Sequence, residues 1–197
     1  MSHYYTDNCN LPSDRKRFDY HFDNEVFQFV TDNGVFSKTA VDFGSRLLIE
    51  NVYRRNLGSR MLDLGCGYGP IGIIIKKFNS DLEVEAVDVN SRAVSLMEEN
   101  CTINKTDIKV FLCEDIITLK NCFDSITLNP PVRAGKSVIF SLYEKAYQKL
   151  NSGGSLYIVL QKKQGALSSK AKLETLFDKV EILDRAAGYY VIAGHKN

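Results

Sequence analysis

The sequence predicts an α/β fold in which helices cover both faces of one open, mainly parallel sheet. From Arg60 onward, short apolar runs alternate with stretches of helical periodicity, and this alternation is typical of βαβ units. The runs expected to form strands are 61–64, 84–89, 108–112, 123–128, 155–160, 180–183 and 189–193. Only residues 184–188 separate the last two runs. This stretch is too short for a crossover helix, so we expect an antiparallel hairpin there.

The expected helices lie before and between these strands. They span residues 40–55, 70–78, 91–104, 138–150 and 166–177. Residues 1–17 are polar and charged, as in a loose leader, and residues 18–31 alternate aromatic and polar side chains, which favours a short β-hairpin. We therefore divide the chain into a leader and hairpin appendage over residues 1–35 and one main domain over residues 36–197.

Composition restricts the class of protein. The formal net charge of the 197 residues is +1, which argues against a whole-surface positive field for nucleic acid but permits a local basic rim. The five cysteines form no CxxC pair and the three histidines lie far apart, so no metal site is expected. The polar N-terminus does not resemble a signal peptide, and no apolar run approaches the roughly 20 residues of a membrane span. These features predict a cytoplasmic protein without a membrane partner.

Residues 61–72, MLDLGCGYGPIG, carry the strongest local signal. The segment runs from a buried strand through three alternating glycines into a helix with Pro70 in its first turn, a position that proline favours. Glycine is needed where the backbone turns tightly against a ligand. Ligands of α/β proteins bind at the carboxyl ends of the strands, so this loop is the expected ligand site.

Two ligands compete for this loop. Gly67, Gly69 and Gly72 satisfy the dinucleotide fingerprint G-x-G-x-x-G, and Asp88 follows at a spacing that suits an acid holding a ribose. However, Asp63 precedes the first glycine at a strand position where dinucleotide folds carry an apolar residue. Its carboxylate suits a ligand with an ammonium group. Together with the terminal hairpin, this favours S-adenosylmethionine (SAM), and a dinucleotide-dependent dehydrogenase is the alternative.

The second informative segment is residues 129–136, NPPVRAGK, after the fourth expected strand. Pro130 and Pro131 stiffen the backbone and remove two N–H donors. The Asn129 side-chain carbonyl and the Pro130 carbonyl then suit the two N–H groups of an exocyclic amine or a side-chain amide. Such acceptors orient the nitrogen lone pair and stabilise the positive charge that develops on it. We therefore predict Asn129, Pro130 and Pro131 to be catalytic, with a purely structural proline turn as the alternative.

With these motifs the chain resembles the class I SAM-dependent methyltransferases, from about Phe29 to Ala193. The resemblance implies a three-layer αβα Rossmann-like fold with seven strands in the order 3-2-1-4-5-7-6, of which strand 7 is antiparallel. It implies contacts from Asp63, Gly65 and Gly67 to the methionine moiety, from Asp88 to the ribose and from Asp115 to the adenine amine. Val89 and Asn129 complete the implied SAM site. Asp115 has an equal alternative as the N-cap of a short helix over residues 116–119.

Longer sequence motifs indicate which family of methyltransferases the chain resembles. NPPVRAGK, together with GVFSK at 34–38 and VDFGS at 41–45, is similar to the 16S ribosomal RNA guanine-N2 methyltransferases in their short, single-domain form. This implies methylation of a guanine N2 amine in 16S ribosomal RNA, free or within the 30S subunit, by a chain that we expect to be monomeric. The alternatives are methylation of another planar amine (adenine N6 or a protein glutamine amide) and a non-catalytic SAM- or RNA-binding assembly factor.

Basic and aromatic side chains complete the expected RNA site. A guanine must leave its stack to reach a buried methyl donor, and phosphate contacts at the rim would offset that cost. The residues expected to bind RNA are Phe36, Lys38, Arg133, Lys136 and Lys162. Val132 stands where amino-methyltransferases carry an aromatic residue. Stacking on the base must therefore come from another ring, such as Phe36 or Tyr68.

Overall fold

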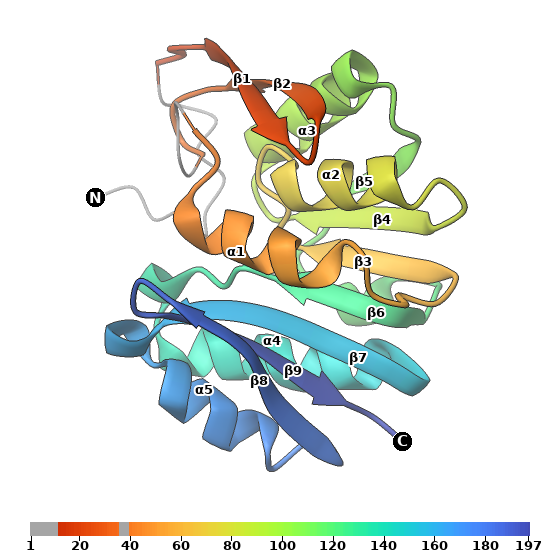
Figure 1. Ribbon diagram of the computed structural model, residues 1–197, viewed down its shortest axis with the longest axis vertical. Helices are drawn as coiled ribbons and strands as arrows, with labels where there is room; N and C mark the ends of the chain where they lie inside the picture. The colour runs from red at the N-terminus through yellow and green to blue at the C-terminus, as the bar shows by residue number, and fades with distance from the viewer. Residues whose placement is uncertain (1–11, 36–39) are drawn as a thin grey trace.

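The computed structural model describes residues 12–35 and 40–197. Within these residues, a seven-stranded sheet has the order β5-β4-β3-β6-β7-β9-β8, and β1 and β2 form a separate hairpin (Figure 1). The strands are β1 (Lys16–Phe22), β2 (Glu25–Thr31), β3 (Arg60–Leu64), β4 (Glu83–Asp88), β5 (Ile108–Leu112), β6 (Phe123–Leu128), β7 (Leu150–Gln161), β8 (Lys179–Ala186) and β9 (Tyr189–His195). The helices are α1 (Phe43–Val52), α2 (Pro70–Phe78), α3 (Ser91–Asn104), α4 (Lys136–Lys149) and α5 (Ala166–Leu173), with short 3-10 helices η1 (Ile116–Thr118), η2 (Val132–Ala134) and η3 (Lys162–Gln164).

The order of the strands confirms the predicted topology. Numbered from β3, the sheet reads 3-2-1-4-5-7-6, and the neighbours of β3, β4 and β6 are all parallel. The last strand, β9, is antiparallel to both β7 and β8. The described residues include no helix long and apolar enough to cross a membrane.

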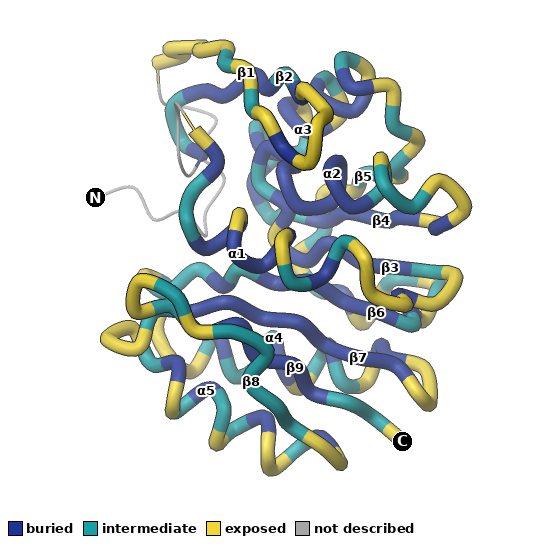
Figure 2. Tube along the Cα trace, in the orientation of Figure 1, coloured by how far each residue is buried: buried dark blue, intermediate teal, exposed yellow. Residues whose placement is uncertain are grey.

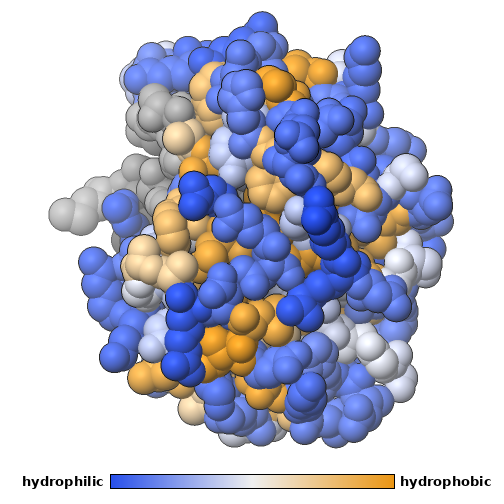
Figure 3. All heavy atoms as spheres, in the orientation of Figure 1, coloured by the Kyte–Doolittle hydropathy of each residue, from blue (hydrophilic) through white to orange (hydrophobic). Residues whose placement is uncertain are grey.

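Helices cover both faces of the sheet, and each face has its own hydrophobic core. Successive residues of a strand point to opposite faces, so Met61 belongs to the core under α1, α2 and α3, whereas Leu62 belongs to the core under α4 and α5. The central strands are buried over most of their length (Figure 2). This double cover explains why they read as continuous apolar runs. Figure 3 shows that polar side chains spread over most of the outer face in this view, with hydrophobic atoms between them.

The hairpin is attached to the main domain through α3. Asn100 accepts a hydrogen bond from the Val30 nitrogen at 2.7 Å and donates to the Val30 oxygen at 2.9 Å. One helical turn later, Asn104 pairs in the same way with the backbone of Gln28, at 3.0 and 2.8 Å. These amides satisfy backbone groups that an edge strand would otherwise leave unpaired. The hairpin side chains Phe22, Phe27, Phe29 and Val30 also join the first core. The boundary at residue 35 stays a prediction.

Several element bounds differ from the prediction. Helix α1 is shorter than residues 40–55 because Asp42 caps it, accepting from the Ser45 nitrogen at 3.0 Å. Helix α4 begins at Lys136, two residues early, directly after Gly135. Strand β7 begins at Leu150, where pairing with Phe123 of β6 extends it across an irregular step. Helix α5 ends at Leu173, four residues before the predicted end.

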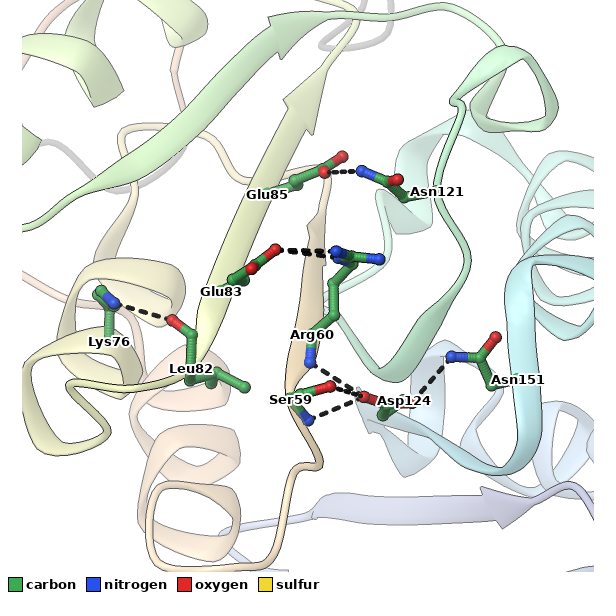
Figure 4. A network of polar contacts seen from close by, with 9 residues as sticks. All are labelled: Ser59, Arg60, Lys76, Leu82, Glu83, Glu85, Asn121, Asp124 and Asn151. Carbon is green, nitrogen blue, oxygen red and sulfur yellow. Dashed lines mark hydrogen bonds and ion pairs between the residues drawn. The ribbon is translucent and has the colours of Figure 1, made fainter.

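A polar network fixes the amino ends of the central strands. The Asp124 carboxylate accepts from the backbone nitrogens of Ser59 and Arg60 at 2.8 and 3.0 Å, and from Asn151 at 2.8 Å. Arg60 also pairs with Glu83 of β4 at 3.0 Å. Figure 4 shows these side chains meeting where β3, β4, β6 and β7 begin. The network occupies the end of the sheet opposite to the glycine loop and leaves the carboxyl ends of the strands for a ligand.

Candidate functional site

A cavity of about 320 Å³ opens at the carboxyl ends of β3, β4 and β6. Its wall combines the glycine loop after β3, the ends of β4 and β5, the segment after β6 and the start of α1. This edge of a parallel sheet is where α/β proteins bind ligands, and the volume is typical of small-molecule sites. The two motifs singled out in the sequence therefore meet in one cavity.

The glycine loop leaves open space in the cavity. The nitrogens of Gly65 and Cys66 both donate to the Val87 oxygen, at 2.8 and 3.0 Å, which holds the loop against β4. Gly65 and Gly67 have φ angles of 71° and 58°, a region that residues with a Cβ adopt rarely. A Cβ on Gly67 would meet no atom within 4 Å, and one on Gly65 would meet only Leu128 at 4.0 Å. Side chains at both positions would extend into this open space.

Asp88 ends β4 and lines the cavity next to Val89. One carboxylate oxygen accepts from the Gly67 nitrogen and the other from the Asn90 nitrogen, both at 2.9 Å. Burial raises the pKa of Asp88, while these backbone hydrogen bonds oppose the rise. A carboxylate has about four acceptor sites, and the backbone of Gly67, Val89 and Asn90 uses part of them, so the fixed group keeps acceptor capacity for a ligand hydroxyl.

Asp63 lies beneath the loop and is not among the residues that line the cavity. Its side chain is 1% exposed and accepts from the Gly72 nitrogen at 2.9 Å and from Thr127 Oγ1 at 3.1 Å. Burial raises its pKa to about 7. Asp63 therefore ties β3 to the start of α2 and to β6. Its direct contact with a ligand ammonium stays a prediction.

Asn129 lines the cavity together with Pro130, Pro131 and Val132. Its Nδ2 donates to Ser45 Oγ at 3.0 Å and to Asp42 Oδ1 at 3.3 Å. Because a carboxylate only accepts hydrogen bonds, the atom that faces Asp42 is the amide nitrogen. This arrangement leaves Oδ1 of Asn129 as the acceptor available to a ligand.

Sequence reasoning assigned no role to Asp42 and Ser45, although both line the cavity. An aspartate directly before an apolar helical run is an N-cap signal, and Asp42 could have placed the start of α1. It could not have revealed the contact with Asn129, which lies 84 positions after Ser45. That contact exists because the sheet brings the start of α1 to the end of β6.

The structure places Asp115 outside the cavity wall. Its carboxylate accepts from the Ile117 nitrogen at 3.1 Å as the N-cap of η1, and it pairs with Lys145 at 3.2 Å. The hydrogen bond from Ile117, followed by the interaction with Lys145, lowers the pKa of Asp115. Glu114, which the sequence analysis did not single out, lines the cavity instead. This geometry favours the N-cap alternative for Asp115.

The residues predicted to bind RNA lie in different places. Arg133 is exposed and lines the cavity. Lys136 stands at the start of α4 with its Nζ 5.1 Å from the centre of the Phe140 ring, and Lys162 is exposed in η3; neither lines the cavity. The predicted residues Phe36 and Lys38 lie outside the described residues. Among the residues described, no cluster of three or more His, Cys, Asp or Glu side chains could hold a metal ion.

Comparison with known sequences finds relatives over almost the whole chain. The model of the methyltransferase small domain family matches residues 26–193. The chain is 42% identical over 197 residues to the uncharacterized protein YbxB of Bacillus subtilis strain 168, a match that covers 98% of each chain. It is 31% identical over 167 residues to ribosomal RNA small subunit methyltransferase C of Shewanella loihica, covering 83% of this chain and 47% of that protein.

Solved structures give a similar result. A T. thermophilus 16S rRNA N2 methyltransferase in complex with AdoMet and guanosine superposes with a TM-score of 0.84 and 26% identity, over 95% of this chain and 52% of that one. A methyltransferase from Pyrococcus furiosus has a TM-score of 0.66 at 21% identity, over 77% of this chain and 81% of that one, which supports the fold alone. The chain spans about half the length of the relatives named ribosomal RNA methyltransferase.

Proposed function

Because the chain belongs to the methyltransferase small domain family, we propose that it uses SAM to methylate the exocyclic N2 amine of a guanine in 16S ribosomal RNA. The main support for the proposal is the way in which the Asn129 side chain is held. The Asn129 amide is held by Asp42 and Ser45 so that its carbonyl oxygen remains available in the cavity that the glycine loop lines. A fixed acceptor beside an open glycine cradle suits transfer of a small group to a nitrogen that carries hydrogens.

The residues of the cavity fit SAM. Gly65 and Gly67 leave the space that a side chain would fill, and their backbone would lie along the methionine moiety. Asp88 would accept hydrogen bonds from the two ribose hydroxyls, and Val89 would pack beside them. Asp63, one layer below, would act on the ligand ammonium through its charge. When bound, SAM supplies a methyl group activated by the positive charge on its sulfonium.

Asn129 and Pro130 would orient the acceptor amine. Asn129 Oδ1 and the Pro130 carbonyl each accept one N–H of the substrate, so the nitrogen lone pair points away from them. The lone pair of an exocyclic amine is delocalised into the ring, and acceptors that hold both hydrogens stabilise the positive charge that develops on nitrogen. After transfer the methylated nitrogen would carry a positive charge and would release one of its two protons to water. An exocyclic ammonium of this kind is acidic enough to lose that proton without a strong general base.

Ribosomal RNA is the substrate that the relatives favour. Relatives at about 30% identity are named ribosomal RNA small subunit methyltransferase, and the similar solved structure is a 16S rRNA N2 methyltransferase with guanosine bound. Arg133, exposed at the cavity wall, would hold a phosphate beside the extruded base. Lys136 and Lys162 would extend this rim.

Methyl transfer from radiolabelled SAM to 30S subunits and to deproteinised 16S RNA tests the proposal. After digestion to nucleosides, the label should be recovered as N2-methylguanosine, and the better substrate shows whether the enzyme recognises a folded subunit. Label in N6-methyladenosine or in a protein glutamine would assign another planar amine. No incorporation, with SAM binding intact by calorimetry, would contradict the proposed function and favour an assembly factor.

A further inference from the structure

The segment 129–132 reads Asn-Pro-Pro-Val and supplies no aromatic ring for stacking on a planar substrate. Among the described residues, the aromatic side chains that line the cavity are Tyr68 and Tyr189. Tyr68 is 3% exposed and its ring packs edge-on against Phe18 and Phe29. Its ring is therefore buried in the first core and has little surface to offer to a ligand. Tyr189 is half-buried at the start of β9 and has surface to offer to a ligand.

Tyr189 is held in place from two directions. Its hydroxyl accepts a hydrogen bond from Gln161 Nε2 at 2.6 Å, and the two residues are direct partners across the β7–β9 pair. Its ring lies 5.2 Å from the ring of Phe43, at an interplanar angle of 41°. A ring fixed at its hydroxyl and supported by a second ring loses little conformational entropy when a ligand stacks on it.

The Tyr189 ring comes close, at Gly44, to the carboxylate that holds the Asn129 amide. A Cβ added at Gly44 would lie 3.1 Å from Tyr189 Cε1 and 3.1 Å from Asp42 Oδ1. The Tyr189 ring and the Asp42 carboxylate therefore approach the same point at the start of α1. Asp42 Oδ1 is also the atom that accepts from Asn129 Nδ2. The ring thus stands beside the group that fixes the predicted methyl-acceptor site.

We propose that Tyr189 provides the aromatic surface on which the planar substrate base stacks, in place of the ring that Val132 lacks. The inference rests on the proposed function. Stacking on an aromatic side chain tolerates different bases because each base has a π face. Tyr189 would therefore hold the base in the cavity, while Asn129 and Pro130 select the amine.

Kinetics of position 189 variants test the role in substrate binding. Tyr189→Ala should raise the KM for RNA by roughly 10- to 100-fold, the range expected for loss of one stacked base, with SAM affinity unchanged by calorimetry. Tyr189→Phe keeps the ring and should stay near the wild-type KM. Tyr190→Ala is the matched control, because Tyr190 packs against the opposite core and beside Arg185. An unchanged KM for RNA in a folded Tyr189→Ala variant would overturn the inference. A KM for RNA that rises in Phe36→Ala but not in Tyr189→Ala would also overturn it, because Phe36 would then be the stacking ring.

Fluorescence separates this inference from the proposed function. The chain contains no tryptophan, so Tyr189→Trp introduces one reporter at the site, and Tyr190→Trp places the control reporter on the other face. With S-adenosylhomocysteine bound, guanosine should quench the first variant saturably and leave the second unchanged. If the wild-type protein methylates no RNA but quenching occurs, only the proposed function fails. Absence of saturable quenching in Tyr189→Trp overturns the role of Tyr189, whatever the turnover.

Discussion

The side-chain nitrogen of Asn129 lies 3.0 Å from Ser45 Oγ, although 84 positions separate the two residues in the sequence. Ser45 stands in the first turn of α1, and Asp42, which caps that helix, accepts a second hydrogen bond from the same nitrogen at 3.3 Å. Helix α1 therefore sets the rotation of the amide and so fixes which of its atoms is available as an acceptor. An acceptor held in advance needs no reorganisation when charge develops on the substrate.

Removal of the Asn129 side chain tests its role as the hydrogen-bond acceptor for the substrate amine. In Asn129→Ala, kcat for methyl transfer should fall by roughly 100-fold or more, as when one preorganised hydrogen-bonding group is lost from a transition state. The affinity for SAM, measured by calorimetry, should stay close to that of the wild-type protein because Gly65, Gly67 and Asp88 are unchanged. Retained turnover would show that Asn129 is not the acceptor.

Ser45→Ala tests whether the orientation of the amide matters. Asp42 alone would then hold the Asn129 nitrogen, and we expect kcat to fall by about 10-fold, the equivalent of one ordinary hydrogen bond. Ser59→Ala is the control, because Ser59 bonds Asp124 at the opposite end of the sheet (Figure 4). Steady-state rates of both variants measure the change in kcat, and thermal melts measure the change in stability. A loss of activity that is equal in the two variants would indicate general destabilisation.

Sequence periodicity was sufficient for the sheet and for the glycine loop, because both depend on local patterns. It could not decide between the neighbouring acids Glu114 and Asp115. The backbone at η1 turns Glu114 toward the cavity, and a contact of Asp115 with the adenine amine stays a prediction. It also missed Tyr189, whose ring reaches the site only after β9 pairs with β7. Such contacts depend on tertiary packing, for which the sequence carries no periodic signal.

Gly67→Ala distinguishes an effect on ligand binding from an effect on the stability of the fold. Gly67 and Gly153 both have positive φ angles, 58° and 78°, and at both positions an added Cβ would meet no atom within 4 Å. Each substitution should therefore lower the free energy of unfolding by about 1 kcal/mol through backbone strain. Only Gly67 lines the cavity, so only Gly67→Ala should lose SAM affinity in a calorimetric titration. Equal SAM affinity in the two variants would argue against a SAM site at the glycine loop.

Asp63 makes stability depend on pH. Burial raises its pKa from the ordinary 3.8 to about 7. Between those values the unfolded chain is ionised while the folded chain keeps the proton, so the contribution of Asp63 to the free energy of unfolding falls as pH rises. Asp63→Asn removes the titrating group. Relative to the wild-type protein, its free energy of unfolding should rise over this interval by up to about 4 kcal/mol, at roughly 1.4 kcal/mol per pKa unit.

Urea denaturation at about pH 5 and about pH 7 measures the difference within this interval, with Asp124→Asn as the control. Although burial raises the pKa of Asp124, hydrogen bonds from Asn151, Ser59 and Arg60 lower it overall. Asp124 contributes stability that is present above its unfolded pKa and is lost only as pH falls below it. The difference between Asp124→Asn and the wild-type protein should therefore stay constant above about pH 5. If Asp63→Asn behaves in the same way, Asp63 is ionised in the folded protein, and the ligand ammonium would meet a carboxylate that is already charged.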